Sequence, residues 1–478
     1  MHPFGQHSPS RLVSALLMSV AAIGSASAAT LSVGSGKTYA APCAAFAKAK
    51  AGDIVEINAQ TYSGDVCAIN VSDLTIRGVN GRPKINAASK NAQGKGTWVV
   101  KGNNVKVENV EMYGAKVPDQ NGAALRLEGT NFTLRSSYLH DNQNGILSSA
   151  NANSNIVVEN SEFGFNGFGD GKTHNLYIGA VASLTFRYNY SHDAKVGHNL
   201  KSRAKLNTIS YNRFSSTTNK PSYEIDLPNA GTSYVIGNVI HQPSSNGNAI
   251  MLAYGMEGAN NPGQDLYVVN NTFLNDDSSR GTFVQVSSKV TKPALIQNNI
   301  FGGTGTMSNQ VNAIDRTNFR SVAPGFINRI LFDLHPIANV LVINAGSEPG
   351  KSASGVDLRP TAQYKHTAAG ETRPVTGTLD IGAYETGLTL PGSAAPVPAP
   401  APAPAPAPTP APSAPVTWTK CAASGGTCSF TGTRQVRFGV PGVYSTKTIT
   451  ASTPCTTAVF GSPTSNSARA CSYSSLAQ

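Results

Sequence analysis

The sequence has few charged side chains, few cysteines and, after its N-terminal segment, no long apolar run. Only 13% of its 478 residues are Asp, Glu, Lys or Arg. No Cys-x-x-Cys pair occurs among the 6 cysteines, which argues against a structural zinc site. No later apolar run approaches the roughly 20 residues of a transmembrane helix, so we expect no membrane span.

The few charges are unevenly balanced. Lys and Arg number 37 against 26 Asp and Glu, which gives a formal net charge of +11 at pH 7. A basic protein is attracted to polyanions such as acidic polysaccharides or nucleic acids, although a merely soluble basic surface has the same balance. Nucleic acid is the poorer fit, because no basic cluster with interleaved aromatic residues follows a known nucleic-acid-binding fold. We therefore expect an acidic polysaccharide as the partner and no nucleic acid.

The N-terminal segment, 1–29, has the layout of a secretory signal peptide. Arg11 precedes the apolar run LVSALLMSVAAIG, and small residues follow as far as Ala29. The mature protein is therefore predicted to be secreted, and we expect it to be a monomer.

The cysteines fit the oxidising environment of an exported protein. Cys43 and Cys67 lie close together in the sequence and are expected to form one disulfide. The other four are expected to form two disulfides, for which three connectivities are open: Cys421, Cys428, Cys455 and Cys471.

A Pro-Ala tract divides the chain. Residues 391–416 have a composition that favours extended polyproline II and cannot form a core. The tract separates a large domain, 30–390, from a small module, 417–478. In the module, Thr, Val, Tyr and Phe alternate between Gly and Pro turns, which predicts short strands stabilised by two disulfides.

The large domain consists of repeats that contain short alternating strands. Seven segments share this pattern and begin at 121 (NGAALRLEG), 144 (NGILSSA), 174 (HNLYIGA), 198 (HNLKSRA), 223 (YEIDLPN), 248 (NAIMLAY) and 281 (GTFVQVS). Alternation with a period of two places one set of side chains inside and the other outside. The predicted inward set is Leu125/Leu127, Ile146/Ser148, Leu176/Ile178, Leu200/Ser202, Ile225/Leu227, Ile250/Leu252 and Val284/Val286.

Each repeat continues with a second alternating segment, such as FTLRSSYL (132–139). An asparagine recurs in six of these segments at spacings of 23 to 33 residues: Asn160, Asn189, Asn212, Asn238, Asn271 and Asn299. Repeats of this length with two or three strands and no helix predict an all-β solenoid, a parallel β-helix. Stacked asparagines would then bond to each other's amides, which is a structural role. The segment CAAFAKAKAGDIVEI (43–57) predicts an N-terminal capping helix followed by the first strand.

The segment AFAKAKAGDIVEINAQTYSG, the repeats and the closing LDIGAYE (379–385) resemble the pectate-lyase-like superfamily of right-handed parallel β-helix proteins. The resemblance covers nearly all of 30–390 and implies that fold. Members of that superfamily include lyases, hydrolases, esterases and epimerases, and some are non-catalytic adhesins. The fold alone therefore does not settle the function.

Charged and polar residues gather on the predicted outward face of three neighbouring repeats. Adjacent rungs lie about 4.8 Å apart and alternate residues about 6.6 Å apart, so the group fits in one patch. It comprises Asn175, Tyr177, Asn199, Lys201, Arg203, Glu224 and Asp226. His174, His198 and Tyr223 precede the three strands and are predicted to stack as a column. Simple pairing of these charges on a solvated face is the alternative to a functional site.

The residue types in this patch suit β-elimination of a uronate polymer. That reaction needs a neutralised substrate carboxylate, a base and a proton for the departing glycosidic oxygen. Arg203 is expected to bind the carboxylate, and Lys201 to act as the base if its pKa is lowered. The expected proton donor is His198, Tyr177 or Tyr223. The expected substrate-binding residues are His174, Asn175, Asn199, Tyr223, Glu224 and Asp226.

Three alternatives follow from the same residues. The patch is similar in kind to β-helix lyases of the chondroitinase B and alginate lyase type, which implies a calcium ion held by Asn199, Glu224 and Asp226. Glu224 and Asp226 alternatively suit an inverting glycoside hydrolase. However, the β-helix polygalacturonases carry Asn-Thr-Asp, Asp-Asp and Gly-His-Gly signatures, of which only GHN (197–199) and a displaced DD (276–277) occur here. The third alternative is a non-catalytic polysaccharide-binding protein.

The module resembles the small cysteine-bearing modules of secreted bacterial carbohydrate-active enzymes. The similarity lies in CAASGGTCSF and TRQVRFG, and it implies a carbohydrate-binding role. Trp418, Phe438 and Tyr444 are the candidates for stacking on sugar rings, although each suits core packing equally well.

Overall fold

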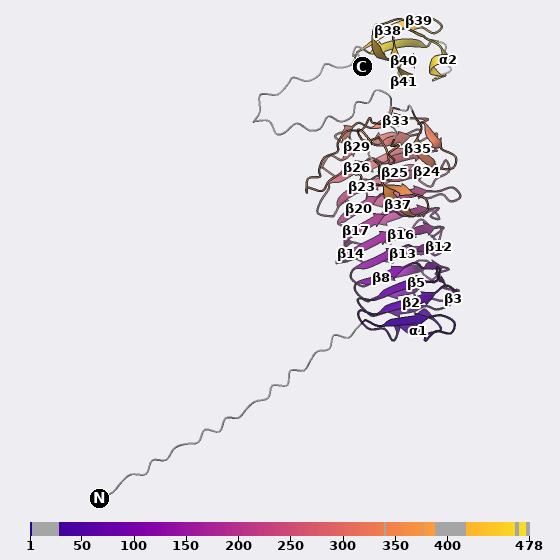
Figure 1. Ribbon diagram of the computed structural model, residues 1–478, viewed down its shortest axis with the longest axis vertical. Helices are drawn as coiled ribbons and strands as arrows, with labels where there is room; N and C mark the ends of the chain where they lie inside the picture. The colour runs from indigo at the N-terminus through magenta and orange to yellow at the C-terminus, as the bar shows by residue number, and fades with distance from the viewer. Residues whose placement is uncertain (2–27, 339–340, 375, 388–416, 464–467, 475–478) are drawn as a thin grey trace. The chain divides into compact units, whose positions relative to one another are not determined.

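The computed structural model describes residues 1, 28–338, 341–374, 376–387, 417–463 and 468–474 (Figure 1). Almost all of the predicted signal peptide, 1–29, and the whole predicted linker, 391–416, lie outside these residues. The chain separates into two compact units, Met1–Val397 and Pro398–Gln478. No helix among the described residues is long and apolar enough to cross a membrane.

The first unit is a parallel β-helix, which confirms the predicted all-β fold. Successive strands along the chain enter three different sheets, and each strand pairs in parallel with its equivalent in the next turn. The 12-stranded sheet contains β1 (Thr30–Val33), β2 (Ile54–Asn58), β5 (Thr75–Val79), β8 (Val105–Glu108), β11 (Phe132–Arg135), β14 (Asn151–Glu159), β17 (Val181–Arg187), β20 (Leu206–Ser210), β23 (Thr232–Ile236), β26 (Leu266–Val269), β29 (Leu295–Gln297) and β32 (Ile314–Arg316).

The other two sheets have the same stacking. The 10-stranded sheet contains β4 (Cys67–Ile69), β7 (Gly96–Val100), β10 (Ala123–Leu127), β13 (Asn144–Ser148), β16 (Leu176–Ile178), β19 (Leu200–Ser202), β22 (Ile225–Leu227), β25 (Ile250–Tyr254), β28 (Thr282–Val286) and β31 (Thr306–Ser308). The 11-stranded sheet contains β3 (Thr61–Ser63), β6 (Lys84–Asn86), β9 (Glu111–Tyr113), β12 (Tyr138–His140), β15 (Glu162–Gly164), β18 (Tyr190–His192), β21 (Arg213–Ser215), β24 (Val239–Gln242), β27 (Thr272–Asn275), β30 (Ile300–Gly302) and β33 (Phe319–Ser321).

The seven predicted repeat strands are β10, β13, β16, β19, β22, β25 and β28 of the 10-stranded sheet. The predicted inward side chains are buried in the core, with one exception. Ile250 is only half-buried, because Leu252 rather than Ile250 pairs with Ile225 in the adjacent strand. The predicted alternation therefore holds there, but the alignment of that repeat is shifted by two residues.

The second predicted segment of each repeat is two strands separated by a bend. FTLRSSYL, for example, contains β11 and β12, and Ser136 lies between them with a φ of 50°. At these bends, each of Asn189, Asn212, Asn238 and Asn271 donates a side-chain hydrogen bond of 2.9–3.1 Å to the asparagine of the next turn. The predicted structural role is confirmed. Asn160 is not part of this ladder, because the neighbouring Ser161 takes the equivalent position and bonds to Asn189.

The N-terminal end of the solenoid is covered by α1 (Pro42–Phe46), as predicted, although β1 already precedes this helix. Phe46 packs edge-on against Trp98 at 5.1 Å between ring centroids, which closes the apolar interior. The predicted disulfide between Cys43 and Cys67 joins the helix to the first strand of the 10-stranded sheet.

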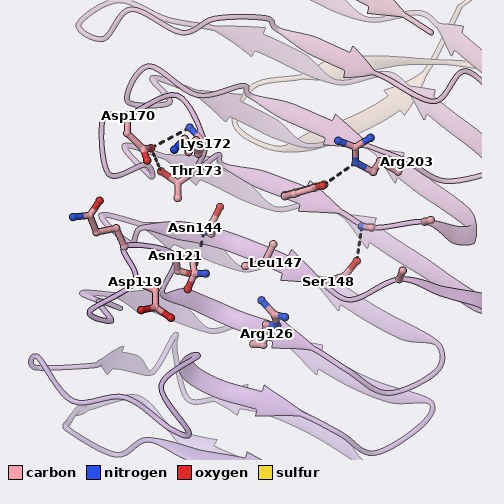
Figure 2. A pocket seen from close by; sticks show the side chains of 15 residues that line it. Asp119, Asn121, Arg126, Asn144, Leu147, Ser148, Asp170, Lys172, Thr173 and Arg203 are labelled. Atoms are coloured by element: carbon pink, nitrogen blue, oxygen red, sulfur yellow. Dashed lines mark hydrogen bonds between the residues drawn. The ribbon is translucent and has the colours of Figure 1, made fainter. Parts of the chain in front are cut away.

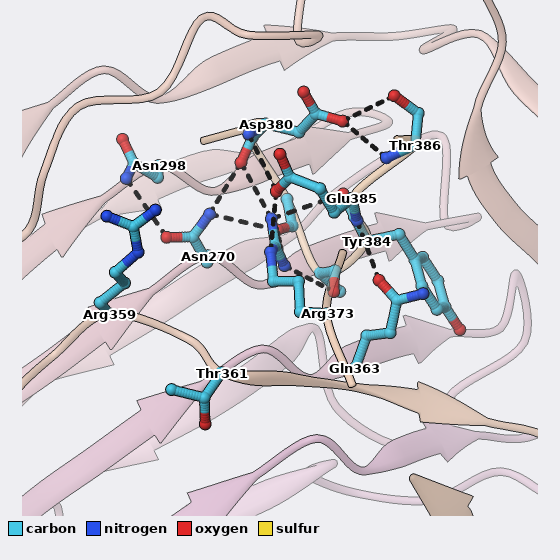
Figure 3. A network of polar contacts seen from close by, with 12 residues as sticks. Asn270, Asn298, Arg359, Thr361, Gln363, Arg373, Asp380, Tyr384, Glu385 and Thr386 are labelled. Carbon is cyan, nitrogen blue, oxygen red and sulfur yellow. Dashed lines mark hydrogen bonds and ion pairs between the residues drawn. The ribbon is translucent and has the colours of Figure 1, made fainter. Parts of the chain in front are cut away.

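The segment that follows the solenoid folds back against it. It contains the hairpins β34 (Phe326–Asn328) with β35 (Asp333–Pro336) and β36 (Ala362–Lys365) with β37 (Ala369–Thr372). Arg373 is buried beneath the closing segment and pairs with Glu385 at 2.9 Å (Figure 3). The same guanidinium donates to the carbonyl oxygens of Asp380 and Ala383. Asn270 of the solenoid donates to the carbonyl oxygen of Asp380 at 2.8 Å, which attaches this network and the closing LDIGAYE segment to the solenoid.

The second unit is a small antiparallel β module. Its four-stranded sheet has the order β38 (Trp418–Ala423), β43 (Ala470–Ser474), β40 (Thr433–Val440) and β41 (Val443–Thr450), and β39 (Thr427–Cys428) pairs with β42 (Thr453–Pro454). A short helix, α2 (Thr457–Phe460), completes its described part. The two predicted disulfides join Cys421 to Cys428 and Cys455 to Cys471.

Candidate functional site

The predicted patch lies on the outer face of the 10-stranded sheet, where parallel pairing aligns equivalent residues. Tyr177 of β16 is opposite Lys201 of β19, which in turn is opposite Asp226 of β22. The same column begins with Arg126 of β10, which pairs with Leu147 of β13. The repeat therefore places side chains far apart in sequence in one row across neighbouring turns.

The centre of the patch is an ionic group that we call the Lys201 cluster: Tyr177, Lys201, Arg203, Asp226 and Glu257. The Nζ atom of Lys201 lies 2.9 Å from an Asp226 oxygen and 2.6 Å from a Glu257 oxygen. Arg203 pairs with the other oxygen of Glu257, and its Nε donates to the hydroxyl of Tyr177 at 2.8 Å. Two cations thus share one carboxylate, that of Glu257.

The members of the Lys201 cluster differ in their access to solvent. The side chains of Lys201 and Asp226 are 9% and 2% exposed, whereas that of Glu257 is 46% exposed. Glu257 lies in the YGMEG segment that follows β25, outside the regular strands. The carboxylate that both cations share is therefore the solvent-facing partner, while the Lys201–Asp226 pair forms the floor beneath it.

The pKa of Lys201 differs from the sequence expectation. Burial by itself would lower it, but the carboxylates of Asp226 and Glu257 raise it above its ordinary value. The condition of a lowered pKa is not met in this arrangement, because the carboxylates of Asp226 and Glu257 together outweigh the effect of burial. Burial raises the pKa of Asp226, although the adjacent Lys201 opposes this shift. Lys201 is therefore a paired ammonium group when Glu257 is in place.

His174, His198 and Tyr223 form the predicted column of rings beside the cluster. His174 stacks on His198 with 4.6 Å between centroids, and His198 stacks on Tyr223 at 4.8 Å. The backbone N–H of His198 donates to Nδ1 of His174, and that of Tyr223 donates to Nδ1 of His198. Both imidazoles accept at Nδ1, so in their neutral form each carries its proton on Nε2.

Both histidines are neutral. Burial and the positive charge of Lys201 lower the pKa of His198 to about 3, and burial lowers that of His174 well below its ordinary value. Nε2 of His198 lies 3.5 Å from a carboxylate oxygen of Asp226. Because Nε2 carries the proton, His198 is placed to donate a hydrogen bond and not to accept one.

Asn175, Asn199 and Glu224 do not lie on the outer face, contrary to the sequence expectation. They are buried in a second amide ladder, in which Asn175 donates to Asn199 and Asn199 donates to Glu224. The ladder begins with Asn142 and Asn166 in the preceding turns. Burial raises the pKa of Glu224 to about 8, so this carboxyl group is neutral below that pH. These side chains support the turn and are not accessible to a polymer.

The residues predicted to hold calcium do not fit that ion. Asn199 and Glu224 bond to each other inside the ladder, and Asp226 bonds to the Lys201 ammonium. A hard cation needs several oxygen ligands that converge on one point, and a neighbouring ammonium competes for the same oxygens. The residues described in the structure include no other group of three His, Cys, Asp or Glu side chains with metal-binding geometry.

A hollow of about 500 Å³ adjoins the Lys201 cluster. Its floor includes Arg126 and Tyr177 from the strands and Arg203, which directly follows β19. Figure 2 shows that side chains from two loops, among them Asp119 and Asp170, lie along one side of it. The hollow spans several turns of the solenoid, and its lining combines three cationic side chains, Arg126, Lys172 and Arg203, with the two aspartates.

Sequence reasoning missed Glu257, Arg126 and Asn229. Asn229 accepts a hydrogen bond from Arg203 at 2.5 Å. Arg126 had a recognisable signal, because it occupies the outward position equivalent to Tyr177 and Lys201. Glu257 and Asn229 lie in loops after the strands, and the repeat pattern does not predict where a loop side chain lies.

The comparisons with known proteins support the fold. A structure of pectate lyase Pel9A superposes with a TM-score of 0.53 at 16% sequence identity, over 72% of this chain and 90% of that one. No protein-family profile matches the sequence, and no curated protein sequence matches it. The similarity at this identity concerns the parallel β-helix architecture.

Proposed function

We propose that this protein is an exported enzyme that cleaves an acidic, uronate-containing polysaccharide by β-elimination at the Lys201 cluster. The observation that carries the proposal is the sharing of the Glu257 carboxylate by Lys201 and Arg203 on an open face beside a hollow. A uronate carboxylate has the same charge and geometry as that of Glu257. It would replace Glu257 on Arg203, whose planar guanidinium binds a carboxylate through two parallel hydrogen bonds.

The replacement of Glu257 also changes Lys201. Glu257 is one of two carboxylates that raise the lysine pKa, while burial acts in the opposite direction. When Glu257 withdraws, the pKa of Lys201 falls, and a larger fraction of the amine is unprotonated and able to accept a proton. Substrate binding and activation of the base are thereby coupled through one displaced side chain.

The chemical step then balances within the site. Lys201 removes the proton on the carbon next to the substrate carboxylate, and Arg203 stabilises the negative charge that develops on that carboxylate. The carbon–carbon double bond forms as the bond to the glycosidic oxygen breaks. Tyr177 supplies the proton to that oxygen, because its own oxygen accepts from Arg203 and its hydrogen is free to be donated. His198 is buried, with its side chain 9% exposed, and it and Tyr223 remain secondary candidates.

Hydrolysis by Glu224 and Asp226 is the less favoured mechanism. The Glu224 side chain is in the buried ladder, and Asp226 is 2% exposed and paired with Lys201. An inverting hydrolase needs two carboxyl groups that flank the glycosidic bond. Neither residue meets that requirement in this arrangement.

The disulfides agree with function outside the cell. The three disulfides among the described residues suit an oxidising compartment, and the acidic polymer would be found there. The proposed enzyme acts as a monomer, since the site is formed by strands and a loop of one chain.

The proposal is tested by incubating the mature protein with a panel of uronate polysaccharides and following ultraviolet absorbance of unsaturated products. Reducing ends are measured in parallel. We expect both signals to rise together for at least one polymer, and both to be lost in Lys201→Gln and Arg203→Gln. Reducing ends without absorbance would move the conclusion to hydrolysis. The absence of both signals across the panel would overturn the enzymatic proposal in favour of a binding protein.

A further inference from the structure

The solvent-facing side of the module's four-stranded sheet presents one arginine between two aromatic rings. The guanidinium carbon of Arg437 lies 4.4 Å from the ring centroid of Trp418 and 4.2 Å from that of Tyr444. These residues belong to β40, β38 and β41, so the group extends across the whole sheet. Alternation along β40 places Arg437 on the face opposite Val436 and Phe438.

The opposite face of that sheet is the core of the module. Val436, Phe438 and Cys471 are completely buried, and Phe438 packs against Phe460 at 5.7 Å between centroids. Phe438 is therefore a core residue, which rules out its predicted stacking on a sugar. Trp418 and Tyr444 keep the predicted surface position, and Arg437 joins them.

The module's charge has one sign only. Residues 417–478 contain no Asp or Glu, and their cationic side chains are Lys420, Arg434, Arg437, Lys447 and Arg469. The whole chain has 26 acidic residues, so their absence here is a local feature of the sequence. No carboxylate side chain of the module is present to neutralise Arg437, whose Nε is buried without a hydrogen-bond partner in the described part of the chain.

We propose that this surface, the Arg437 face (Trp418, Arg437 and Tyr444), binds the carboxylate-bearing sugar residues of an acidic polysaccharide. The two rings hold the guanidinium plane in place, and they remove water from its faces while its N–H groups stay directed at a ligand. A carboxylate satisfies that planar group through two hydrogen bonds. The outer parts of the rings then pack against the apolar faces of adjacent sugars.

A polysaccharide is favoured over nucleic acid by the rest of the same face. The strand positions beside Arg437 are Ser472 and Thr446, Gln435 lies two residues away on its own strand, and Lys420, opposite Ser472, is the other cation on this face. Short hydroxyl and amide groups suit the hydroxyl groups of sugars, whereas a nucleic-acid surface relies on several cations that follow the phosphates. The inference depends only on the module and does not require the Lys201 cluster to be catalytic.

Tryptophan fluorescence of the full-length chain tests this inference. The sequence has 2 tryptophans, and Trp98 is completely buried in the solenoid, so a change on ligand addition reports Trp418. The ligands are polygalacturonate, alginate, the carboxyl-reduced forms of both, and single-stranded DNA. We expect saturable changes with at least one uronate polymer, and an affinity at least about tenfold lower for its carboxyl-reduced form.

Variants identify the residue responsible. Arg437→Gln is expected to weaken binding at least about tenfold, and Arg437→Lys to restore only a small part, because lysine keeps the charge without the planar fork. Lys447→Gln is the matched control: it removes the same charge from a neighbouring strand, on the face opposite Arg437. Circular dichroism and intact disulfides confirm that each variant folds.

Several results would contradict the inference. Equal binding of the carboxyl-reduced polymers, equal loss in Arg437→Gln and Lys447→Gln, tighter binding of DNA, or no binding to any polymer would each overturn the inference. Because the readout is binding at Trp418, it can succeed when no unsaturated product is formed, and it can fail while the Lys201 cluster remains active. The failure of this inference and that of the proposed function are therefore distinguishable.

Discussion

Two of the ionic groups in the described part of the β-helix unit, the Arg373 pair and the Lys201 cluster, are built differently. Arg373 and Glu385 are 0% and 1% exposed, and the guanidinium also donates to backbone carbonyls of the closing segment (Figure 3). The Lys201 cluster has a buried pair as its floor, but its upper carboxylate, Glu257, is 46% exposed and comes from a loop.

The difference indicates the role of each group. A buried pair whose remaining hydrogen bonds are satisfied has no partner to exchange, and breaking it leaves an uncompensated charge. An exposed carboxylate shared by two cations contributes little to stability and can be replaced by a ligand of the same charge. We therefore expect the Arg373 pair to affect folding and the Lys201 cluster to affect activity.

The largest effect is expected for Lys201→Gln. Loss of the base should lower kcat by roughly 10²–10⁴-fold, as measured by the absorbance of unsaturated product. Lys205→Gln is the matched control, since Lys205 is an exposed lysine of the same turn outside the cluster. Equal activity in Lys201→Gln and Lys205→Gln would show that Lys201 is not the catalytic base.

Arg373→Met should act on stability instead. Removal of one partner from the buried pair is expected to lower the free energy of unfolding by about 3–5 kcal/mol, measured by denaturant titration, while the folded fraction keeps its activity. Arg359→Met breaks an exposed pair with Glu348 and should cost less than about 1 kcal/mol. A similar loss in both variants would contradict the assigned structural role of Arg373.

Glu224→Gln tests the buried ladder beneath the site. The folded-state pKa of Glu224 is raised to about 8, so between its ordinary value and that pH the folded state holds a proton that the unfolded state has lost. Stability from this residue is therefore present at low pH and falls as the pH rises toward 8, by at most roughly 4–5 kcal/mol.

The glutamine has the same shape and does not titrate, so the variant should gain stability relative to the native chain between about pH 5 and pH 8. Unfolding titrations at both pH values measure the difference. A difference that does not vary with pH would show that Glu224 is ionised in the folded protein.

Glu257→Gln should have the smallest effect, on substrate affinity and pH dependence. The amide no longer competes with the substrate carboxylate, so KM should fall several-fold at low ionic strength. The pKa of Lys201 should also fall, because one carboxylate that raises it is gone. The alkaline rise of kcat/KM should then move to lower pH, which a pH–rate profile measures. An unchanged profile would mean that Glu257 does not control Lys201.

The sequence predicted the repeats, the parallel solenoid, the capping helix and the stacked asparagines, because a period of two residues repeated over many turns determines both side-chain direction and neighbours. It also placed Tyr177, Lys201 and Asp226 in one row for the same reason. These features depend on local pattern and on the nearly constant distance between rungs.

The repeat pattern did not predict the conformation of the bend that precedes each strand. Asn175, Asn199 and Glu224 precede the regular pairing at the bend, where side chains turn into the interior and form a ladder. Extending the alternation back to them therefore gave the wrong face. Glu257 was not identified because its position depends on the loop conformation after β25, for which the sequence has no repeating signal.

The central claim is that the Lys201 cluster breaks the polymer by elimination. The most direct test is mass spectrometry of the products formed in water enriched in heavy oxygen. Elimination predicts products that are lighter than the hydrolysis products by one water molecule and whose unsaturated terminal ring contains no solvent oxygen, and their loss in Lys201→Gln. Saturated products that carry the solvent label would contradict the account.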